Sequence, residues 1–245
     1  MGRPPTADTL VLIPALDEED TVADVVRSAK QLLGCDVLVV DDGSSDNTSI
    51  RSRRAGAMVI RHPINIGVGG AIRTGMRVAQ RLGKTYVVQL DADGQHDAND
   101  AARLLDVVGS GEADVVVGSR FEHGYEASRT RSAMMRLLSR WVSRRIGTTV
   151  TDTTSGFRAF GPSAIELFSR SYPTMYLSDT VEALLMAADT GLRVQETAVR
   201  MHPRLGGTAS AGPFRAATRL ARLWLVLLLH PIRRPEKPRG VSDEA

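Results

Sequence analysis

The stretch Tyr86-Val87-Val88-Gln89-Leu90-Asp91-Ala92-Asp93-Gly94-Gln95-His96 carries the strongest structural signal in the chain. Its apolar first half predicts a buried strand, and Gly94 after it predicts a turn. Asp91 and Asp93 then lie at the strand end, where a cation would relieve the repulsion between their carboxylates. Oxygen ligands favour Mg²⁺ or Mn²⁺, and Mg²⁺ is commonly held by one or two carboxylates plus substrate phosphates. The stretch therefore predicts a site for a metal-bound phosphate substrate, with Gln95 as a further candidate ligand and His96 in a local turn hydrogen bond.

Similar apolar runs recur through the first half of the chain and alternate with segments of helical periodicity. The expected strands span residues 10–13, 37–40, 57–60, 86–90 and 114–118, and the expected helices include residues 18–33, 70–82 and 98–108. Near-continuous Val, Leu and Ile strands are typical of a parallel sheet covered on both faces. The sequence therefore predicts an α/β fold, with a mostly parallel sheet sandwiched by helices. Ligands of such sheets bind beyond the carboxyl ends of the strands, which is where the polar clusters fall.

The second half is less regular. It predicts a basic helix at 131–146, a polar turn region at 153–160, a helix at 179–190, a strand at 192–201 and a loop at 203–212. The segment Phe214–Leu229 predicts an amphipathic helix, with arginines on one face and Leu and Trp on another, which fits either a membrane interface or a core or oligomer contact. We therefore expect one α/β domain at 1–212, this helix at 213–230 and a basic, disordered tail at 231–245.

Composition excludes several classes of protein. Hydrophobic residues make up 42% of the 245 residues and charged residues 24%, which is typical of a globular protein. The formal net charge is only +3, and we expect no nucleic-acid partner. Cys35 is the single cysteine, which favours a reducing compartment. We expect neither a signal peptide nor a transmembrane span, because no apolar run is long enough.

Two further polar segments follow expected strands. Asp41-Asp42-Gly43-Ser44-Ser45-Asp46 is typical of a turn with Asp46 as the helix N-cap, but two adjacent acids exceed what a cap requires. A carboxylate there can accept hydrogen bonds from a ribose or a base edge. The glycine-rich stretch 62–70 can present backbone N–H groups to phosphate, although it is not a P-loop. The first segment alone is equally compatible with an ordinary turn, and the glycine spacing of the second does not by itself establish a phosphate site.

Charged residues of the second half add candidates. Arg120 follows an expected strand, and Arg158 closes a compact Ser-Gly-Phe-Arg segment. Arginine suits bidentate contact with phosphate, although surface arginines are usually only solvated. Asp179 and Glu182 share one face of an expected helix, where a catalytic base or two solvated acids would fit. Arg204 lies in a glycine-rich segment that fits either a lid or a plain loop.

Taken in order, these segments resemble the family 2 glycosyltransferases of the GT-A fold. The resemblance is carried by Pro14-Ala15-x-Asp17-Glu18, Asp41-Asp42-Gly43-Ser44-Ser45-Asp46, Asn65-x-Gly67, Asp91-Ala92-Asp93-Gly94-Gln95-His96, Gly118-Ser119-Arg120 and Ser155-Gly156-Phe157-Arg158. The pattern, which runs from about residue 10 to residue 210, is most similar to dolichol-phosphate mannose synthases and bacterial polyprenyl-phosphate glycosyltransferases. It implies a GDP-mannose or UDP-glucose type of donor, Mg²⁺ or Mn²⁺, and inversion at the anomeric carbon.

The resemblance also implies roles for individual residues. The donor would be bound by Pro14, Glu18, Asp41, Asp42, Asn65 and Gly67. The metal and the diphosphate would be held by Asp91, Asp93 and Gln95, with Asp93 essential for catalysis. The phosphate groups would be met by three arginines, with Arg120 and Arg158 on the acceptor and Arg204 on the donor.

Three positions depart from the family pattern. Asp17 stands where Asn is common, and Ala98 replaces a usual proline. Neither change removes a ligand. Thr208, Ala209 and Ser210 follow Arg204 where relatives often carry a lysine, so the resemblance does not carry over a second phosphate contact there.

Three functions stay open at this point. An enzyme could transfer a hexose to polyprenyl phosphate, whose ionised phosphate attacks without a strong base. It could instead use a saccharide or small-molecule hydroxyl, which needs a base such as Asp179 or Glu182. The chain could also be a non-catalytic nucleotide-sugar-binding protein. The first function predicts a peripheral protein on the cytoplasmic face of a membrane, held by Phe214–Leu229, with a small membrane protein or a second copy as a further partner.

Overall fold

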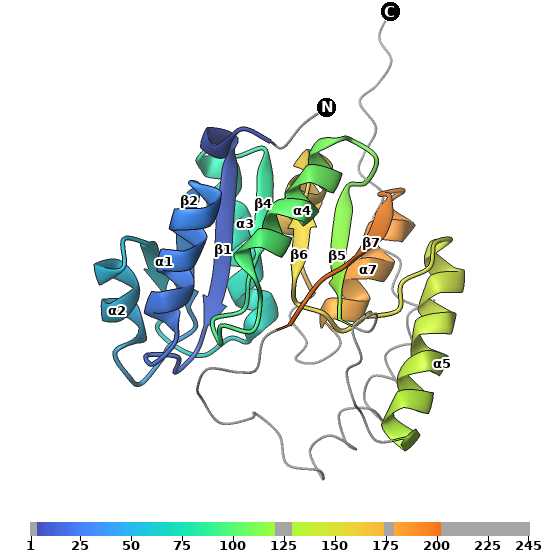
Figure 1. Ribbon diagram of the computed structural model, residues 1–245, viewed down its shortest axis with the longest axis horizontal. Coiled ribbons are helices and arrows are strands. Elements are labelled where there is room, and N and C mark those ends of the chain that lie inside the picture. The colour runs from blue at the N-terminus through green and yellow to red at the C-terminus, as the bar shows by residue number, and fades with distance from the viewer. Residues whose placement is uncertain (1–3, 121–128, 174–178, 202–245) are drawn as a thin grey trace, which may run out of the picture.

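Figure 1 shows the computed structural model of the chain, in which one twisted sheet lies between layers of helices. The structure describes residues 4–120, 129–173 and 179–201. The strands within these residues are β1 (Thr9–Ala15), β2 (Asp36–Asp41), β3 (Met58–Arg61), β4 (Tyr86–Gln89), β5 (Val115–Ser119), β6 (Arg158–Phe160) and β7 (Val194–Ala198). They pair in the order β3-β2-β1-β4-β6-β5-β7, and every pair is parallel except the two that contain β6. The predicted mostly parallel α/β sheet is confirmed.

Helices cover both faces of this sheet (Figure 1). On one face lie α1 (Val22–Leu33), α2 (Thr48–Arg54) and α4 (Ala98–Gly109). On the other lie α3 (Val68–Arg81), α6 (Pro162–Arg170) and α7 (Asp179–Asp189), and α5 (Arg129–Ile146) packs against α7. The predicted amphipathic helix, the tail and Arg204 lie outside the described residues, so the predicted domain division stays a prediction.

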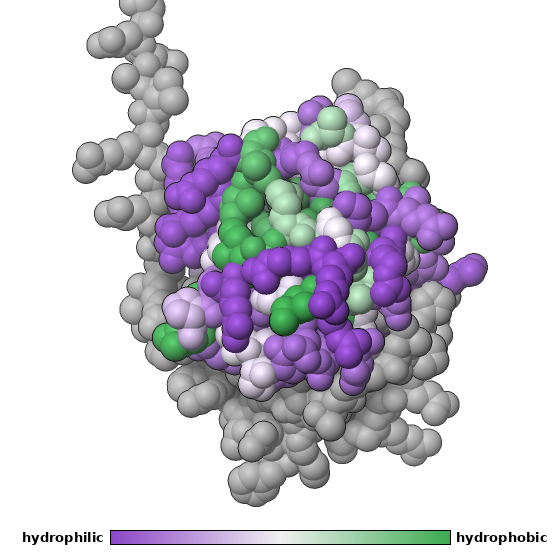
Figure 2. Space-filling view, turned by 90° about the vertical axis from the view of Figure 1, so that its left-hand side faces the viewer, coloured by the Kyte–Doolittle hydropathy of each residue, from purple (hydrophilic) through white to green (hydrophobic). Residues whose placement is uncertain are grey.

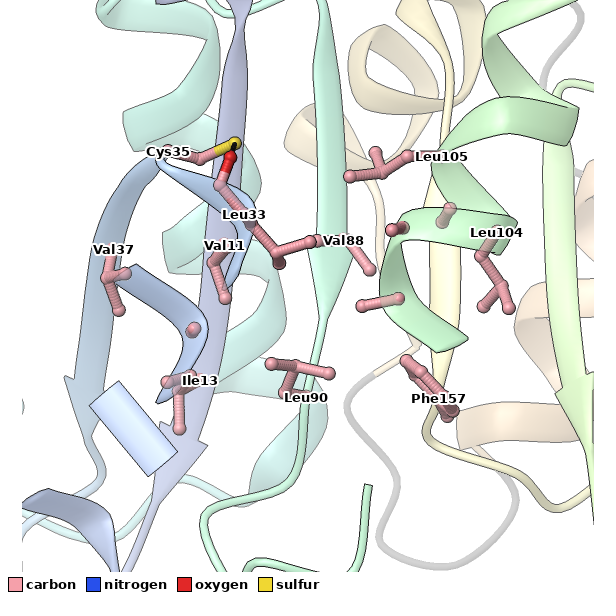
Figure 3. Packing of buried hydrophobic residues seen from close by; sticks show 14 of the residues in the cluster. Val11, Ile13, Leu33, Cys35, Val37, Val88, Leu90, Leu104, Leu105 and Phe157 are labelled. Carbon is pink, nitrogen blue, oxygen red and sulfur yellow. Dashed lines mark hydrogen bonds between the residues drawn. The ribbon is translucent and has the colours of Figure 1, made fainter. Parts of the chain in front are cut away.

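The alternation of side chains along each strand divides them between two cores. On β1, Val11 and Ile13 face the core under α1 and α4, while Leu10 and Leu12 face the core under α3 and α6. Figure 3 shows the first core, where Phe157 packs beside side chains of α4. Burying one such side chain contributes roughly 1.5–3 kcal/mol relative to leaving it exposed. Both faces of the sheet are therefore apolar, which explains why its strands are nearly continuous runs of Val, Leu and Ile.

Two elements of the second half correct the sequence prediction. Strand β6 falls in the segment predicted as a turn region, and α6 was not predicted. Three residues are too few to show a strand period, although all three side chains of β6 are buried between β4 and β5. Helix α1 begins at Val22 rather than at residue 18, and the backbone N–H of Glu18 donates to the Thr48 hydroxyl at 2.8 Å.

Strand β3 forms one edge of the sheet. Figure 2 faces this side of the molecule and shows apolar surface bordered by hydrophilic side chains. Met58 in β3 is 38% exposed, and the strand ends at the exposed Arg61. Charged side chains beside an edge strand oppose pairing with another chain. The opposite edge of the sheet is β7, and α5 lies beyond it.

Candidate active site

A pocket of about 270 Å³ opens at the carboxyl ends of β1, β2 and β4. Seven residues predicted for the site line it: Pro14, Glu18, Asp42, Asn65, Gly67, Asp91 and Asp93. The other predicted residues that the structure describes are not among its lining: Asp41, Gln95, Arg120, Arg158, Asp179 and Glu182. The strand ends therefore bring the predicted nucleoside and metal residues together in one cavity.

Asp42 shapes the pocket wall as well as lining it. Its Oδ1 atom accepts hydrogen bonds from His62 Nδ1 at 2.7 Å and from the Ile66 N–H at 3.1 Å, and its Oδ2 atom accepts from the Gly67 N–H at 2.7 Å. His62 Nε2 in turn lies 2.9 Å from the Thr74 hydroxyl. His62 was not among the residues predicted for the site. Its position directly after β3, at the same edge of the sheet as Asp42, could have indicated that the two residues are neighbours.

Asp41 was predicted to bind the donor, but the structure places its side chain in the interior of the protein. Its side chain accepts hydrogen bonds from the Ser44 N–H at 2.8 Å and from the Ser49 hydroxyl. Burial alone would raise the pKa of Asp41, but these hydrogen bonds and the charge of Arg61 outweigh it, so the pKa lies below the usual value. Asp41 therefore holds the turn before α2 in its ionised form.

The loops after β1 and β2 are tied together by acidic side chains. Asp17 has a positive φ of 52°, and its Oδ1 atom accepts from both the N–H and the hydroxyl of Ser45, at 2.7 and 3.1 Å. Asn has the same Oδ1 acceptor, which explains why Asp17 can replace it. Asp46 accepts from the Glu19 N–H at 3.0 Å and from the Thr48 N–H at 2.9 Å.

The prediction that Asp46 is the N-cap of the next helix is wrong by one residue. The N-cap of α2 is Asn47, whose side chain makes no capping hydrogen bond. The carboxylate of Asp46 performs that function from one position earlier. Glu18, from the neighbouring loop after β1, lines the pocket. Its Oε2 atom also accepts a hydrogen bond from the Thr21 hydroxyl at 3.0 Å.

The predicted metal residues occupy the turn between β4 and α4. The side chain of Asp91 is 42% exposed, whereas Asp93 is buried and accepts from the Gln95 N–H at 3.1 Å. The predicted local hydrogen bond of His96 is confirmed, because its Nδ1 atom accepts from the Asp91 N–H at 3.1 Å. The turn thus presents two carboxylates to the pocket and keeps His96 behind them.

Helix α4 begins where the sequence departs from the usual proline. Asp97 is the N-cap and accepts from the Asn99 N–H at 2.8 Å, so Ala98 takes the first helical position. Proline is favoured there because its missing N–H would be unpaired anyway, and alanine is a strong helix former. The substitution therefore leaves the preceding acidic turn in place.

The donor atoms of this turn fit a hard divalent cation. Across residues 4–120, 129–173 and 179–201, no group of three or more His, Cys, Asp or Glu side chains gathers as a metal site. Asp91 and Asp93 supply two carboxylates on one pocket wall. Mg²⁺ is commonly bound in this way, with substrate phosphates completing its coordination.

Arg120 is partly exposed, and its known contacts are structural. Its Nε atom donates to Asp152 Oδ2 at 2.7 Å, and an Nη atom donates to the Thr154 hydroxyl at 3.2 Å. Asp152 is fully buried. This ion pair anchors the end of β5 to the segment that precedes β6, and about a quarter of the Arg120 side chain stays exposed for a further contact.

Arg158 corrects the prediction that it meets an acceptor phosphate. Only 1% of the residue is exposed, and its guanidinium donates to the backbone carbonyls of Thr153, Ser155 and Thr180 at 3.3, 2.9 and 2.9 Å. Burial lowers the pKa of Arg158, while nearby Asp179 opposes that shift. The structure thus assigns Arg158 to holding the segment before β6 against α7.

Of the two candidate bases, Asp179 has the unusual environment. Burial raises its pKa to about 6, against the effects of the Thr180 N–H and of Arg158. Its Oδ1 atom accepts from that N–H at 2.9 Å, and its buried Oδ2 atom has no hydrogen-bond partner in the described part of the chain. Glu182 lies one helical turn further on and is half-buried.

Comparison with known proteins assigns the chain to a class of sugar-transferring enzymes. The fold is similar to that of glucosyl-3-phosphoglycerate synthase from Mycobacterium tuberculosis, solved with Mn²⁺, uridine diphosphate and phosphoglyceric acid; the TM-score is 0.68 at 21% identity, over 93% of this chain and 79% of that chain. This is the GT-A fold, as predicted. The model of glycosyl transferase family 2 matches residues 10–171. The chain belongs to this family and is a glycosyltransferase.

Two curated relatives are similar over much of their length. UDP-N-acetylglucosamine–dolichyl-phosphate N-acetylglucosaminyltransferase from Methanococcus voltae is 31% identical over 216 residues, covering 79% of this chain and 86% of the relative. Polyprenol monophosphomannose synthase from Mycolicibacterium smegmatis is 30% identical over 172 residues, covering 66% of this chain and 64% of the relative. Both names describe transfer of a sugar to a polyprenyl-type phosphate.

Proposed function

We propose that this protein transfers a hexose from a nucleotide-diphosphate sugar to a polyprenyl phosphate, with a divalent metal and with inversion at the anomeric carbon. The observation that carries the proposal is that two groups of side chains line the same pocket. The first group is Pro14, Glu18 and Asp42, and the second is Asp91 and Asp93. The first group suits a nucleoside and the second a metal-bound diphosphate. The family and the acceptors named in its two relatives support the lipid phosphate.

The chain's own residues bind and orient the donor. Asp42 is held in place by three hydrogen bonds, so it offers a fixed acceptor edge to a ribose or base. Asp91 and Asp93 fix the position of the diphosphate across the pocket. Arg120 is the partly exposed arginine at the carboxyl end of β5 that would contact the acceptor phosphate, while Arg204 is proposed for the donor phosphates.

The metal, when bound by Asp91 and Asp93 with Gln95 near them, supplies a Lewis acid that stabilises negative charge on the leaving diphosphate. The acceptor phosphate is largely ionised near neutral pH, since its second pKa is about 6. It therefore needs no strong base from the protein. Positioning and charge stabilisation are the contributions left to the side chains.

A lipid acceptor places the reaction beside a membrane. In the part of the chain that the structure describes, no helix has the length and apolar character to cross a bilayer. We propose that the segment Phe214–Leu229 lies on the cytoplasmic face of the membrane and brings the pocket to the lipid phosphate. A small membrane protein or a second copy of the chain are further partners that this helix would suit.

A transfer assay tests the proposal directly. Purified protein is incubated with polyprenyl phosphate, Mn²⁺ and, in separate series, labelled GDP-mannose, UDP-glucose and UDP-N-acetylglucosamine. We expect one donor to give labelled lipid, and we expect removal of the metal with EDTA to stop the reaction. Absence of labelled lipid with every donor, in the presence of bound nucleotide, would contradict the lipid acceptor.

A hydroxyl acceptor is the second candidate, and the buried carboxyl of Asp179 favours it. A pKa of about 6 suits a general base near neutral pH. Asp179→Asn would then lower kcat by about 10²–10⁴-fold on a saccharide acceptor. With a phosphate acceptor, kcat is expected to stay within about threefold of wild type, because no base is needed.

The Asp179→Asn variant also has a predicted pH signature. The folded-state pKa of Asp179 lies above the ordinary value of 3.8, so the folded protein binds the extra proton more tightly and loses stability as pH rises from about 4 through 6. Above pH 6 the variant is expected to be more stable than wild type, by up to about 3 kcal/mol for two pK units, with no difference near pH 4. Urea unfolding at pH 4, 6 and 8 measures this. A difference in unfolding free energy between variant and wild type that is the same at all three pH values would contradict this prediction.

A further inference from the structure

His96 lies directly behind the exposed carboxylate of Asp91. Only 5% of its side chain is exposed, and both ring nitrogens face the same residue: Nδ1 lies 3.1 Å from the Asp91 backbone nitrogen, and Nε2 lies 3.6 Å from Asp91 Oδ2. The second distance is too long for a hydrogen bond but places the ring edge beside the carboxylate. The sequence predicted only a local turn hydrogen bond for this histidine, and no role in binding or catalysis.

The backbone contact fixes which nitrogen carries the ring proton. Nδ1 accepts the Asp91 N–H, so it has no proton of its own, and the neutral ring carries its proton on Nε2. The nitrogen that carries this proton lies 3.6 Å from Asp91 Oδ2, so the positive edge of the ring is beside the carboxylate. The same arrangement, in which a second residue orients a metal-binding group, commonly tunes metal sites.

The ring is held in this orientation from behind. It stacks on Phe157, with ring centroids 4.5 Å apart and planes 12° from parallel, and Phe157 is fully buried. The backbone of His96 also pairs with that of Met201 in an isolated antiparallel bridge. The ring therefore cannot turn away from Asp91 without disrupting the core.

The other side of the Asp91 carboxylate is limited by Gly156. A Cβ atom placed on Gly156 would lie 2.9 Å from Asp91 Oδ1, closer than such contacts occur, so only glycine leaves room for the carboxylate there. The segment before β6 thus supplies both the stacking partner of His96 and the open space beside Asp91.

We propose, on the basis of the proposed metal-dependent transfer, that His96 is a positioning residue that aims the Asp91 carboxylate at the metal and diphosphate. In this assignment Phe157 and Gly156 act through the same carboxylate. The Ser-Gly-Phe-Arg segment, whose Arg158 was predicted to bind the acceptor phosphate, then stabilises the donor half of the pocket. Arg158 anchors that segment from the interior.

Mn²⁺ binding tests the assignment without relying on activity. Free Mn²⁺ is counted by electron paramagnetic resonance, with protein alone and in separate series with UDP and GDP. His96→Phe keeps the stack but removes both nitrogens, and we expect it to raise the Kd for Mn²⁺ by about tenfold or more. His96→Asn can still accept the Asp91 N–H, and we expect its Kd for Mn²⁺ to lie between those of wild type and His96→Phe.

Phe168→Leu is the matched control, because Phe168 is a buried aromatic residue in the core on the opposite face of the sheet. It is expected to bind Mn²⁺ like wild type. A His96→Phe protein that binds Mn²⁺ as tightly as wild type, or that loses no more affinity than Phe168→Leu, overturns the role of His96 alone. If His96→Phe does not fold, His96→Asn carries the same comparison. Wild type that binds no Mn²⁺ with either nucleotide would overturn the proposed metal site as well.

Discussion

The Asp93→Asn variant is expected to lose about 10³-fold in kcat/KM, the upper range for removing one charge-stabilising group, while it keeps the stability of wild type. Asp93 is buried at the pocket wall, and its Oδ1 atom accepts the Gln95 N–H at 3.1 Å. Asparagine keeps that acceptor and the side-chain shape but removes the negative charge. The loss therefore isolates the negative charge that binding of the metal requires. Initial rates of labelled-lipid formation at several Mn²⁺ concentrations measure it.

Asp97→Asn is the control for this variant. Asp97 belongs to the same acidic stretch but caps α4, and it does not line the pocket. Asparagine is as good an N-cap as aspartate, so activity is expected to stay within about twofold of wild type. Equal activity of Asp93→Asn and Asp97→Asn would show that Asp93 takes no part in catalysis.

The Arg158→Met variant is expected to lose about 3 kcal/mol or more of unfolding free energy, because three backbone carbonyls lose their donor in a site that water does not reach. These are the carbonyls of Thr153, Ser155 and Thr180. Methionine fills a similar volume, so the loss reports hydrogen bonding rather than a cavity. For a protein of this size, that loss lowers Tm by roughly 6–12 °C. Thermal and urea unfolding measure it.

Arg170→Met is the matched surface change. The Arg170 side chain is 67% exposed and pairs with Glu166 one turn earlier on α6, so its loss is expected to cost less than about 0.5 kcal/mol. The outcome separates two roles of Arg158. If Arg158 contacted the acceptor, Arg158→Met would keep the Tm of wild type and raise the KM for polyprenyl phosphate instead.

The parallel part of the sheet could be predicted because its signals are local. β1, β2 and β4 are apolar runs that each end in a polar cluster, and their ends define the pocket. β6 could not be predicted in this way, since its three residues acquire their strand conformation only by pairing with β4 and β5. Long-range pairing of this kind leaves no period in the sequence.

Within the site, residue type and order along the chain were enough to place Asp42, Asp91 and Asp93. They were not enough to separate Asp42 from Asp41, which are adjacent and chemically identical. Only the three-dimensional surroundings show that Ser44 and Ser49 already satisfy Asp41. Arg158 was misplaced for a related reason, because a buried arginine and a phosphate-binding arginine look alike in a sequence.

The reversed direction of β6 has a consequence for how this enzyme could change its acceptor. β5 leaves the sheet at Ser119 and the chain re-enters at Arg158, and Val117 pairs with Arg158, so both ends of the intervening segment lie at the same edge. The nucleotide half of the pocket comes wholly from residues that precede this excursion. The part of this insertion that precedes Ser155 can therefore be lengthened, shortened or exchanged during evolution, so that acceptor choice can diverge. Gly156 and Phe157 stay constant, because they border Asp91 and His96 in the donor half.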